Sequence, residues 1–297
     1  MFYSIRCSTT TLLPSLLLLL LSMIIMVKII DMVDSDTVGY NNNTNNNSIE
    51  YRVNGNDKVS IADAPWVVSI RNTEKNAELI CGGVIVDKYW LLTTAQCIAG
   101  RSIQNMFVVS GSDKLHDIQH KHNIDKIVFP DLTDKNKLSD SKVKQLSDNI
   151  AMVKIKQAGF NFQNKNIQKI QPFLTKELSD SLDMTVYGWG SIGLTSRSTI
   201  NETYHDRLTK LAIKIFSNDY CSVEQTNLYL YCLYSKTNGA SRYDRGGPVV
   251  VQHNGQKLLA GIVSYTYYDT QKNAKKYTIV SSVRPWWIWI QKTIKTN

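Results

Sequence analysis

The 297-residue sequence lacks several features that would place it quickly in a class of proteins. It has no internal repeat at a fixed period, which argues against a repeat architecture. It contains no nucleic-acid-binding motif, and its lysines and arginines are scattered, so we expect no nucleic-acid partner. No apolar run after residue 30 is long enough to span a membrane. Residues 31–52 hold no cysteine, which excludes a small disulfide-stapled module there.

The composition that is present indicates a globular chain with much strand. Hydrophobic residues make up 43% and charged residues 20%, and tyrosine, valine, isoleucine and threonine, which favour strands, are frequent. The length allows one large domain or two small ones. The formal net charge of +9 suits contact with an acidic surface such as a polyanionic glycan, anionic lipid or acidic protein. Solubility alone is the other interpretation of that charge.

The N-terminus has the pattern of a targeting segment. Arg6 precedes an apolar run from Leu12 to Val27, and Lys28 interrupts that run. The run is short for a membrane span, so residues 1–30 are predicted to be a signal peptide, with an uncleaved signal anchor as the alternative. In both cases the remainder of the chain enters an oxidising compartment, and we expect a secreted, extracellular protein.

Residues 31–52 are predicted to be an unstructured leader or propeptide. The run NNNTNNNS is polar and of low complexity, and it cannot form a core. Three N-x-S/T sequons predict glycosylation and agree with secretion: Asn42, Asn46 and Asn201.

Five cysteines occur, and Cys7 lies in the predicted signal peptide. The other four are Cys81, Cys97, Cys221 and Cys232. An even number in a secreted chain indicates two disulfides. Counting alone leaves all three possible connectivities open.

From Val53 onward the pattern predicts short strands separated by turns. The first set is PWVVSIR, LICGGVIV, KYWLLTTA, MFVVSG, IDKIVF and NIAMVKI; the second is DMTVYGWG, LAIKIFS, YLYCLYS, GPVVVQHNGQKLLAGIVSYTY and KYTIVSSV. The Asn-Gly pair in QHNGQK is a strong hairpin signal. This pattern predicts a β-barrel or a sandwich, and the tail RPWWIWIQKTI predicts a terminal helix.

The segment YDRGGPVVV combines a tight turn with a cation at its tip. Gly246 and Gly247 can take positive φ, and Pro248 then fixes the exit into a β-branched run. Arg245 stands just before the glycines, where a small residue would be expected.

Several motifs follow one another in a specific order. They are CGGVIVDKYWLLTTAQC, DNIAMVKI, YGWG, YDRGGPVV and GIVSY, followed by a C-terminal strand and helix. In this order the chain resembles the trypsin/chymotrypsin-like serine protease family from residue 53 to its end. The resemblance implies an all-β fold of two packed six-stranded antiparallel β-barrels with a C-terminal helix. It implies barrel one at about residues 53–175, barrel two at about 176–285, and the helix at 286–297. It also implies the disulfides Cys81–Cys97 and Cys221–Cys232.

The chemistry of that family needs a serine nucleophile, a histidine base and a buried carboxylate that orients the base. By the resemblance, the matching positions here are Arg245, Gln96 and Asn149. An amide cannot act as a general base near neutral pH, and Asp148 would point to the opposite face of its strand. Loss of the serine or histidine of such a triad costs on the order of 10⁶ in turnover. The resemblance therefore predicts a catalytically inactive homologue.

Other positions identified by the resemblance also depart from the family. Tyr243 replaces the oxyanion-hole glycine two places before the nucleophile, and it would restrict the turn. Gly239 at the base of the substrate pocket offers no carboxylate, and Thr266 and Lys275 replace glycines of its walls. The cysteine pair that braces this pocket is missing, with Ser241 at one of its ends.

Asp244 keeps the identity that the family has at this position, where it receives the amine freed by propeptide cleavage. Cleavage between Arg52 and Val53 would free Val53, whereas a register one place different would put Arg52 at the new terminus. Alternatively, Asp244 acts locally, either by pairing with Arg245 or by capping backbone N–H groups. Switching by cleavage is therefore a hypothesis.

The histidines do not supply a base, because none falls at the matching position. They are His116, His120, His122, His205 and His253. All lie in polar, loop-like segments, so we interpret them as surface residues. The spacing in HDIQHKH is only loosely compatible with a metal site, and we expect neither a metal nor a cofactor.

These patterns predict a secreted, monomeric, catalytically inactive serine protease homologue that acts by binding protein. The expected partner is an active protease, a zymogen or an inhibitor, and the role is that of decoy, cofactor or regulator in a protease cascade. By resemblance, such homologues occur in arthropod immunity and in venoms. One alternative is an active secreted endopeptidase with displaced catalytic groups. The other is a basic module that binds a polyanionic glycan or surface.

Overall fold

The computed structural model describes residues 57–74, 76–130, 149–175, 182–192, 203–215, 230–234, 239–269 and 275–297. All of them belong to one compact unit, Glu50–Asn297. Several predictions lie outside the described residues: the signal peptide, the leader, the Arg52–Val53 cleavage site, the three sequons, Asp148 and Cys221.

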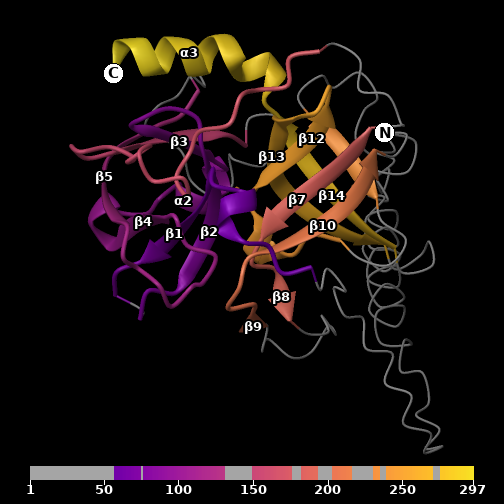
Figure 1. Ribbon diagram of the computed structural model, residues 1–297, viewed down its shortest axis with the longest axis horizontal. Helices are drawn as coiled ribbons and strands as arrows, with labels where there is room; N and C mark the ends of the chain where they lie inside the picture. Colours follow the sequence, from indigo (N-terminus) through magenta and orange to yellow (C-terminus); the bar gives the residue numbers. More distant parts are fainter. Residues whose placement is uncertain are drawn as a thin grey trace, which may run out of the picture. The chain divides into compact units, whose positions relative to one another are not determined.

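The first barrel closes in the strand order β1-β2-β3-β6-β5-β4, and all its pairs are antiparallel (Figure 1). Its strands are β1 (Val67–Asn72), β2 (Leu79–Ile85), β3 (Trp90–Thr93), β4 (Met106–Ser110), β5 (Lys121–Val128) and β6 (Ala151–Ile155). Aliphatic side chains such as Ile70, Ile85 and Val153 fill its interior. These strands form because β-branched side chains pack well on a pleated, half-buried surface.

The second barrel closes in the order β10-β11-β14-β13-β12-β7, again with antiparallel pairs. Its strands are β7 (Asp183–Gly188), β10 (Thr209–Ile215), β11 (Leu230–Tyr234), β12 (Pro248–His253), β13 (Gln256–Asp269) and β14 (Lys275–Ser282), with a separate small sheet of β8 (Ser191–Ile192) and β9 (Thr203–Tyr204). The predicted hairpin joins β12 to β13. Asn254 and Gly255 have φ of 48° and 75°, the positive values that a type I′ turn requires.

Helix α3 (Trp287–Thr296) returns from the second barrel to lie over the first (Figure 1). It follows the short turn η6 (Arg284–Trp286), and its Ile290 is fully buried. Lys126 of β5 donates a hydrogen bond to the Asn297 side chain at 2.8 Å. The predicted fold class is therefore confirmed. No helix within the described residues is long and apolar enough to cross a membrane.

One apolar cluster joins the two barrels. It combines side chains of the first barrel, such as Trp66 and Leu92, with Tyr187, Val250 and Ile262 of the second. Trp66 packs edge-on against Tyr187 with ring centroids 6.2 Å apart. Because burial of shared apolar surface favours association, this cluster holds together the two walls between which the site lies.

Candidate functional site

The turn η5 (Arg242–Asp244) and the residues after it carry Arg245 to the junction of the barrels. Gly246 has φ of 77°, and a Cβ there would lie 2.3 Å from the Gly82 carbonyl oxygen. Gly247 has no positive φ, but a Cβ there would lie 2.6 Å from the Tyr187 carbonyl oxygen. The glycine pair is thus required for conformation at its first position and for space at its second. The prediction of positive φ holds for the first glycine and is wrong for the second.

Backbone hydrogen bonds tie this turn to both barrels. The Gly82 N–H of β2 donates to the Arg245 carbonyl at 2.8 Å, and the Gly246 N–H donates to the Val263 carbonyl of β13 at 2.8 Å. The Thr93 hydroxyl donates to the Gly82 carbonyl at 2.9 Å. The position of Arg245 is therefore fixed by its main chain, whatever its side chain does.

Asp244 is buried and caps the turn. Its Oδ2 accepts from the Ser241 N–H at 2.7 Å, and its Oδ1 accepts from the Gly190 N–H at 2.8 Å. The Ser241 hydroxyl in turn accepts from the Tyr243 N–H at 3.2 Å, which completes a capping box. The local role of Asp244 therefore includes backbone capping, with Ser241 supplying the reciprocal cap.

The two backbone N–H groups that would receive an oxyanion both donate inside the turn. The Tyr243 N–H donates to the Ser241 hydroxyl at 3.2 Å, and the Arg245 N–H donates to the Arg242 carbonyl at 3.4 Å. An oxyanion hole requires donors aimed at the developing charge. In this conformation the η5 turn directs neither of these donors at a substrate carbonyl.

Gln96 and Asn149 are joined by a hydrogen bond at the junction of the barrels. Gln96 is in the short helix α2 (Ala95–Ile98), and its N–H donates to the Asn149 Oδ1 at 2.9 Å. Asn149 is 1% exposed, and its Nδ2 donates to the Ser264 hydroxyl of β13 at 2.8 Å. The Ser281 hydroxyl of β14 donates to the Asn149 carbonyl at 3.2 Å. Asn149 thus joins the barrels through neutral hydrogen bonds, with its amide oxygen and nitrogen both engaged.

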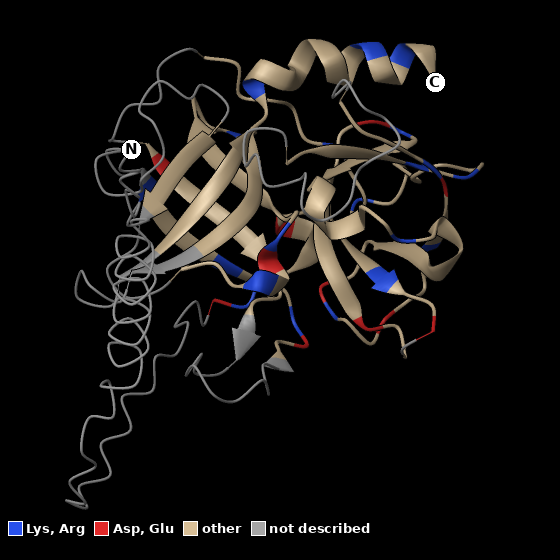
Figure 2. Ribbon diagram, turned by 180° about the vertical axis from the view of Figure 1, so that it is seen from behind, with Lys and Arg blue, Asp and Glu red and all other residues tan. Residues whose placement is uncertain are grey.

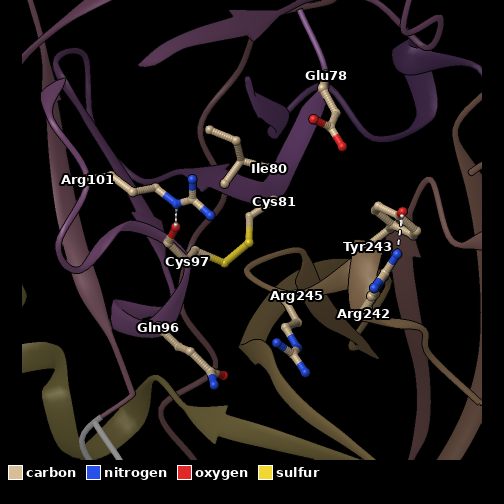
Figure 3. A pocket seen from close by; sticks show the side chains of 9 residues that line it. All are labelled: Glu78, Ile80, Cys81, Gln96, Cys97, Arg101, Arg242, Tyr243 and Arg245. Atoms are coloured by element: carbon tan, nitrogen blue, oxygen red, sulfur yellow. Dashed lines mark hydrogen bonds between the residues drawn. A yellow bond between two sulfur atoms is a disulfide. The ribbon is translucent and has the colours of Figure 1, made fainter. Parts of the chain in front are cut away.

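A pocket of about 280 Å³ opens beside these groups (Figure 3). Its lining residues come from both barrels: Glu78, Ile80, Cys81, Gln96, Cys97, Arg101, Arg242, Tyr243 and Arg245. A disulfide joins Cys81 to Cys97 with their Cα atoms 6.1 Å apart. Cys232 of β11 is also disulfide-bonded, while its predicted partner lies outside the described residues. The structure therefore brings Gln96, Tyr243 and Arg245 together around one pocket.

Three arginines of this pocket are held by specific contacts. The Arg101 Nε donates to the Cys97 carbonyl at 2.9 Å. Arg242 donates to the Tyr243 hydroxyl at 2.8 Å, and its guanidinium lies 4.8 Å from the centroid of that ring. The Arg245 guanidinium lies 5.4 Å from the centroid of the Tyr265 ring. The cation–π contacts orient the guanidinium groups of Arg242 and Arg245.

Sequence reasoning missed Arg101 and Arg242 as site residues. They come from segments 141 positions apart in the numbering, and only closure of both barrels brings them to one pocket. Arg242 had a local signal, since it directly precedes the quoted motif. Ser264 stands in the quoted GIVSY motif, but without the fold nothing linked it to Asn149.

None of the predicted substrate-pocket residues lines this pocket. Gly239 is buried before Ala240, whose N–H donates to the Thr278 hydroxyl at 3.1 Å. Thr266 of β13 pairs with Thr278 of β14, and Lys275 pairs with Asp269 at the other end of the same ladder.

The interpretation of all histidines as loop residues is wrong for His253, the last residue of β12, and for His122. His122 lies within β5 opposite Val108 and is partly buried, because strand pairing places it there despite the polar local sequence. Its Nε2 lies 2.8 Å from the Ser110 hydroxyl oxygen. Burial, aided by the nearby His120, lowers the pKa of His122 to about 4. Ser110 is only 1% exposed, so this serine–histidine pair is closed to a substrate.

The remaining histidines have separate surroundings. His116 pairs with Asp206 at 3.0 Å on the surface, and Asp206 has its pKa lowered chiefly by that hydrogen bond. Burial lowers the pKa of His205, although the Asp244 carboxylate opposes this. Among the described residues, no three His, Cys, Asp or Glu side chains are grouped so that they could hold a metal ion.

Comparison with protein families matches residues 53–287 to the model described as Trypsin. Urokinase-type plasminogen activator of Gallus gallus is 24% identical over 258 residues, covering 80% of this chain and 56% of that protein. Venom serine protease 34 of Apis mellifera is 27% identical over 229 residues, covering 72% and 52%. Trypsin iota of Drosophila melanogaster is 27% identical over 246 residues, covering 79% and 86%. The chain thus spans little more than half the length of the first two relatives.

A solved structure agrees with the observed architecture. Neuropsin, described as a serine protease expressed in the limbic system of mouse brain, matches with a TM-score of 0.63 at 21% identity. The match covers 80% of this chain and 97% of that one. At this identity the likeness concerns the fold.

Proposed function

Because the chain belongs to the trypsin family of serine proteases, we propose that it is a secreted member that has no proteolytic activity and acts by binding another protein. The observation that carries the proposal is the content of the cleft. Gln96 and Arg245 line its pocket and Asn149 lies behind Gln96, so these three positions hold neither a hydroxyl nucleophile nor a general base. Loss of the nucleophile or base alone costs on the order of 10⁶ in turnover.

The hydrogen bonding of the η5 turn also supports inactivity. Catalysis by the oxyanion hole alone would need the N–H groups of Tyr243 and Arg245, and both donate within the turn. Removal of one such donor typically costs about 10²–10³ in turnover. The activity that binding and oxyanion stabilisation leave in a damaged triad is therefore reduced further here.

Binding is the function that this scaffold retains. Both walls of the cleft are intact, and the pocket between them is lined by charged, aromatic and aliphatic side chains. We propose an active protease, its zymogen or an inhibitor as the partner, with the chain serving as decoy, cofactor or regulator. The apolar N-terminal run and the sequons support secretion. A relative whose name includes the word venom agrees with a role outside the cell.

A peptidase assay on the purified mature protein tests the proposal. We expect no hydrolysis of mixed peptide substrates and no burst with a serine-directed active-site titrant, with an active trypsin as the positive control. Binding is then measured directly by titration against an active trypsin-family protease and against a protein inhibitor of such proteases. Turnover by the purified chain that disappears on replacing a histidine would overturn the claim of inactivity.

A further inference from the structure

Among the described residues that line it, the pocket has three guanidinium groups and one carboxylate, that of Glu78. We propose that this pocket binds an acidic segment of a protein, with a carboxylate side chain received by Arg242, Arg245 and Arg101. The inference rests on the proposed binding function and adds to it a site and a ligand chemistry.

The three arginines approach the pocket from different elements. Arg101 follows α2 in the first barrel, while Arg242 begins the η5 turn between β11 and β12 and Arg245 follows that turn. Figure 3 shows Arg101 beside the disulfide and Arg242 on the opposite side, with Arg245 between them. A group entering the pocket therefore meets positive charge from both barrels.

Each guanidinium is oriented before any ligand arrives. The Tyr243 ring and hydroxyl position Arg242, the Tyr265 ring positions Arg245, and the Cys97 carbonyl positions Arg101. Planar guanidinium groups match carboxylates with paired N–H donors, and they are more weakly hydrated than ammonium groups. Ordering of these side chains in advance lowers the entropy lost on binding.

The surroundings favour a peptide over a long polyanion. The pocket is small, about 280 Å³, and includes the aliphatic Ile80 and the disulfide, which suit the methylene groups of a glutamate or a neighbouring apolar residue. The Glu78 carboxylate would repel a densely charged chain. Among the described residues, other lysines and arginines lie on both barrels and on α3 (Figure 2).

The test measures fluorescence anisotropy with a labelled hexapeptide, Gly-Leu-Glu-Glu-Leu-Gly, and its Gln-Gln counterpart. We expect the acidic peptide to bind at least tenfold more tightly at 50 mM NaCl and to weaken clearly at 500 mM, where surface charges are screened. Arg242→Gln and Arg245→Gln should each reduce its affinity about tenfold. Arg245→Lys, which keeps the charge but loses the planar fork, should recover part of that loss.

A matched control comes from Arg207, an exposed arginine that pairs with Asp113 and does not line the pocket. Arg207→Gln removes the same charge, and we expect affinity for the acidic peptide to stay within twofold. Thermal unfolding of every variant checks that the fold is kept. If Arg245→Gln does not fold, Arg242→Gln decides, because the Arg242 side chain is exposed.

Three results would overturn the inference: equal affinity for the two peptides, an equal loss with Arg207→Gln, or binding of a heparin tetrasaccharide while the acidic peptide does not bind. A peptidase assay on the same preparations keeps the two proposals separate. Hydrolysis would contradict the proposed absence of activity, whereas the anisotropy comparison would still report on the pocket.

Discussion

The buried junction of the barrels is held by neutral hydrogen bonds, whereas the pocket beside it is lined by charged side chains. At the junction, Asn149, Ser264 and Ser281 form neutral hydrogen bonds in the interior, and the turn at Gly246 fits against backbone atoms. In the pocket, charged side chains rest on aromatic rings with solvent nearby. The contrast teaches that the frame of a protease cleft can be kept while the groups facing the cleft change. Substitutions at the junction should therefore affect stability, and those in the pocket should affect binding.

Gly246→Ala should give the largest effect. Its Cβ would lie 2.3 Å from the Gly82 carbonyl oxygen and from the Thr93 hydroxyl, at a positive φ. We expect a loss of about 4 kcal/mol in unfolding free energy or failure to fold, measured by urea unfolding. Gly100→Ala is the matched control, because Gly100 also has positive φ but no atom within 4 Å of the added Cβ. It should lose only about 1–2 kcal/mol, and equal losses would refute the steric argument.

Asn149→Leu should have the next largest effect. It leaves the Gln96 N–H without its acceptor and removes the amide partner of the Ser264 hydroxyl. Unsatisfied buried groups of this kind cost about 1–3 kcal/mol each, so we expect a loss of about 3 kcal/mol by urea unfolding. Asn161→Ala, which removes one exposed local hydrogen bond to the Gln163 N–H, should cost less than about 1 kcal/mol. A smaller loss at the buried site than at this exposed one would contradict the contrast.

Acid should destabilise the first barrel through His122. Its pKa falls from 6.5 to about 4 in the folded state, so the unfolded chain binds this proton more readily. The neutral residue stabilises the fold fully above pH 6.5, and that stability is lost as the pH falls from 6.5 towards 4. We expect a loss on the order of 2 kcal/mol across this window by urea unfolding.

His122→Gln should flatten this pH dependence, because it removes the proton-binding group. The control is His116→Gln. His116 is exposed and pairs with Asp206 on the surface, so this variant should keep the wild-type dependence of stability on pH. If both variants keep the wild-type profile, another group is responsible for the acid sensitivity.

Arg245→Ser should have the smallest effect. We expect its peptidase turnover to remain undetectable, as in the wild type. Restoring a hydroxyl supplies no base at Gln96, and the N–H groups of the turn stay engaged. The same variant should fold, because the turn is held by main-chain bonds, and its affinity for the acidic hexapeptide should fall about tenfold. Measurable proteolysis from this single change would show that the correspondence of positions is wrong.

Much of the fold could be predicted because its signals are local. Alternating apolar residues mark the strands, and Asn254-Gly255 marks a hairpin whose φ values the structure confirms. The order of motifs resembles that of the trypsin-like family, and this resemblance implied two barrels. His122 was assigned wrongly because its neighbours are polar, and only pairing with β4 shows that it belongs to a strand.

The site was harder to predict because its contacts are distant in sequence. Asn149 and Ser264 are 115 positions apart, and their hydrogen bond depends on how the two barrels pack. The arginine pocket likewise needs α2 and η5 to face each other. The position of Arg245 was identifiable from its motif, but its contact with the Tyr265 ring was not.

The bond from the Gly82 N–H to the Arg245 carbonyl has a consequence for how this surface can evolve. A main-chain bond does not depend on the side chain that follows it, so position 245 is anchored yet open to exchange. Substitutions at this one residue, whether natural or from a saturation library, could therefore change partner preference one at a time. In each variant the main-chain bond would keep the loop in the same conformation.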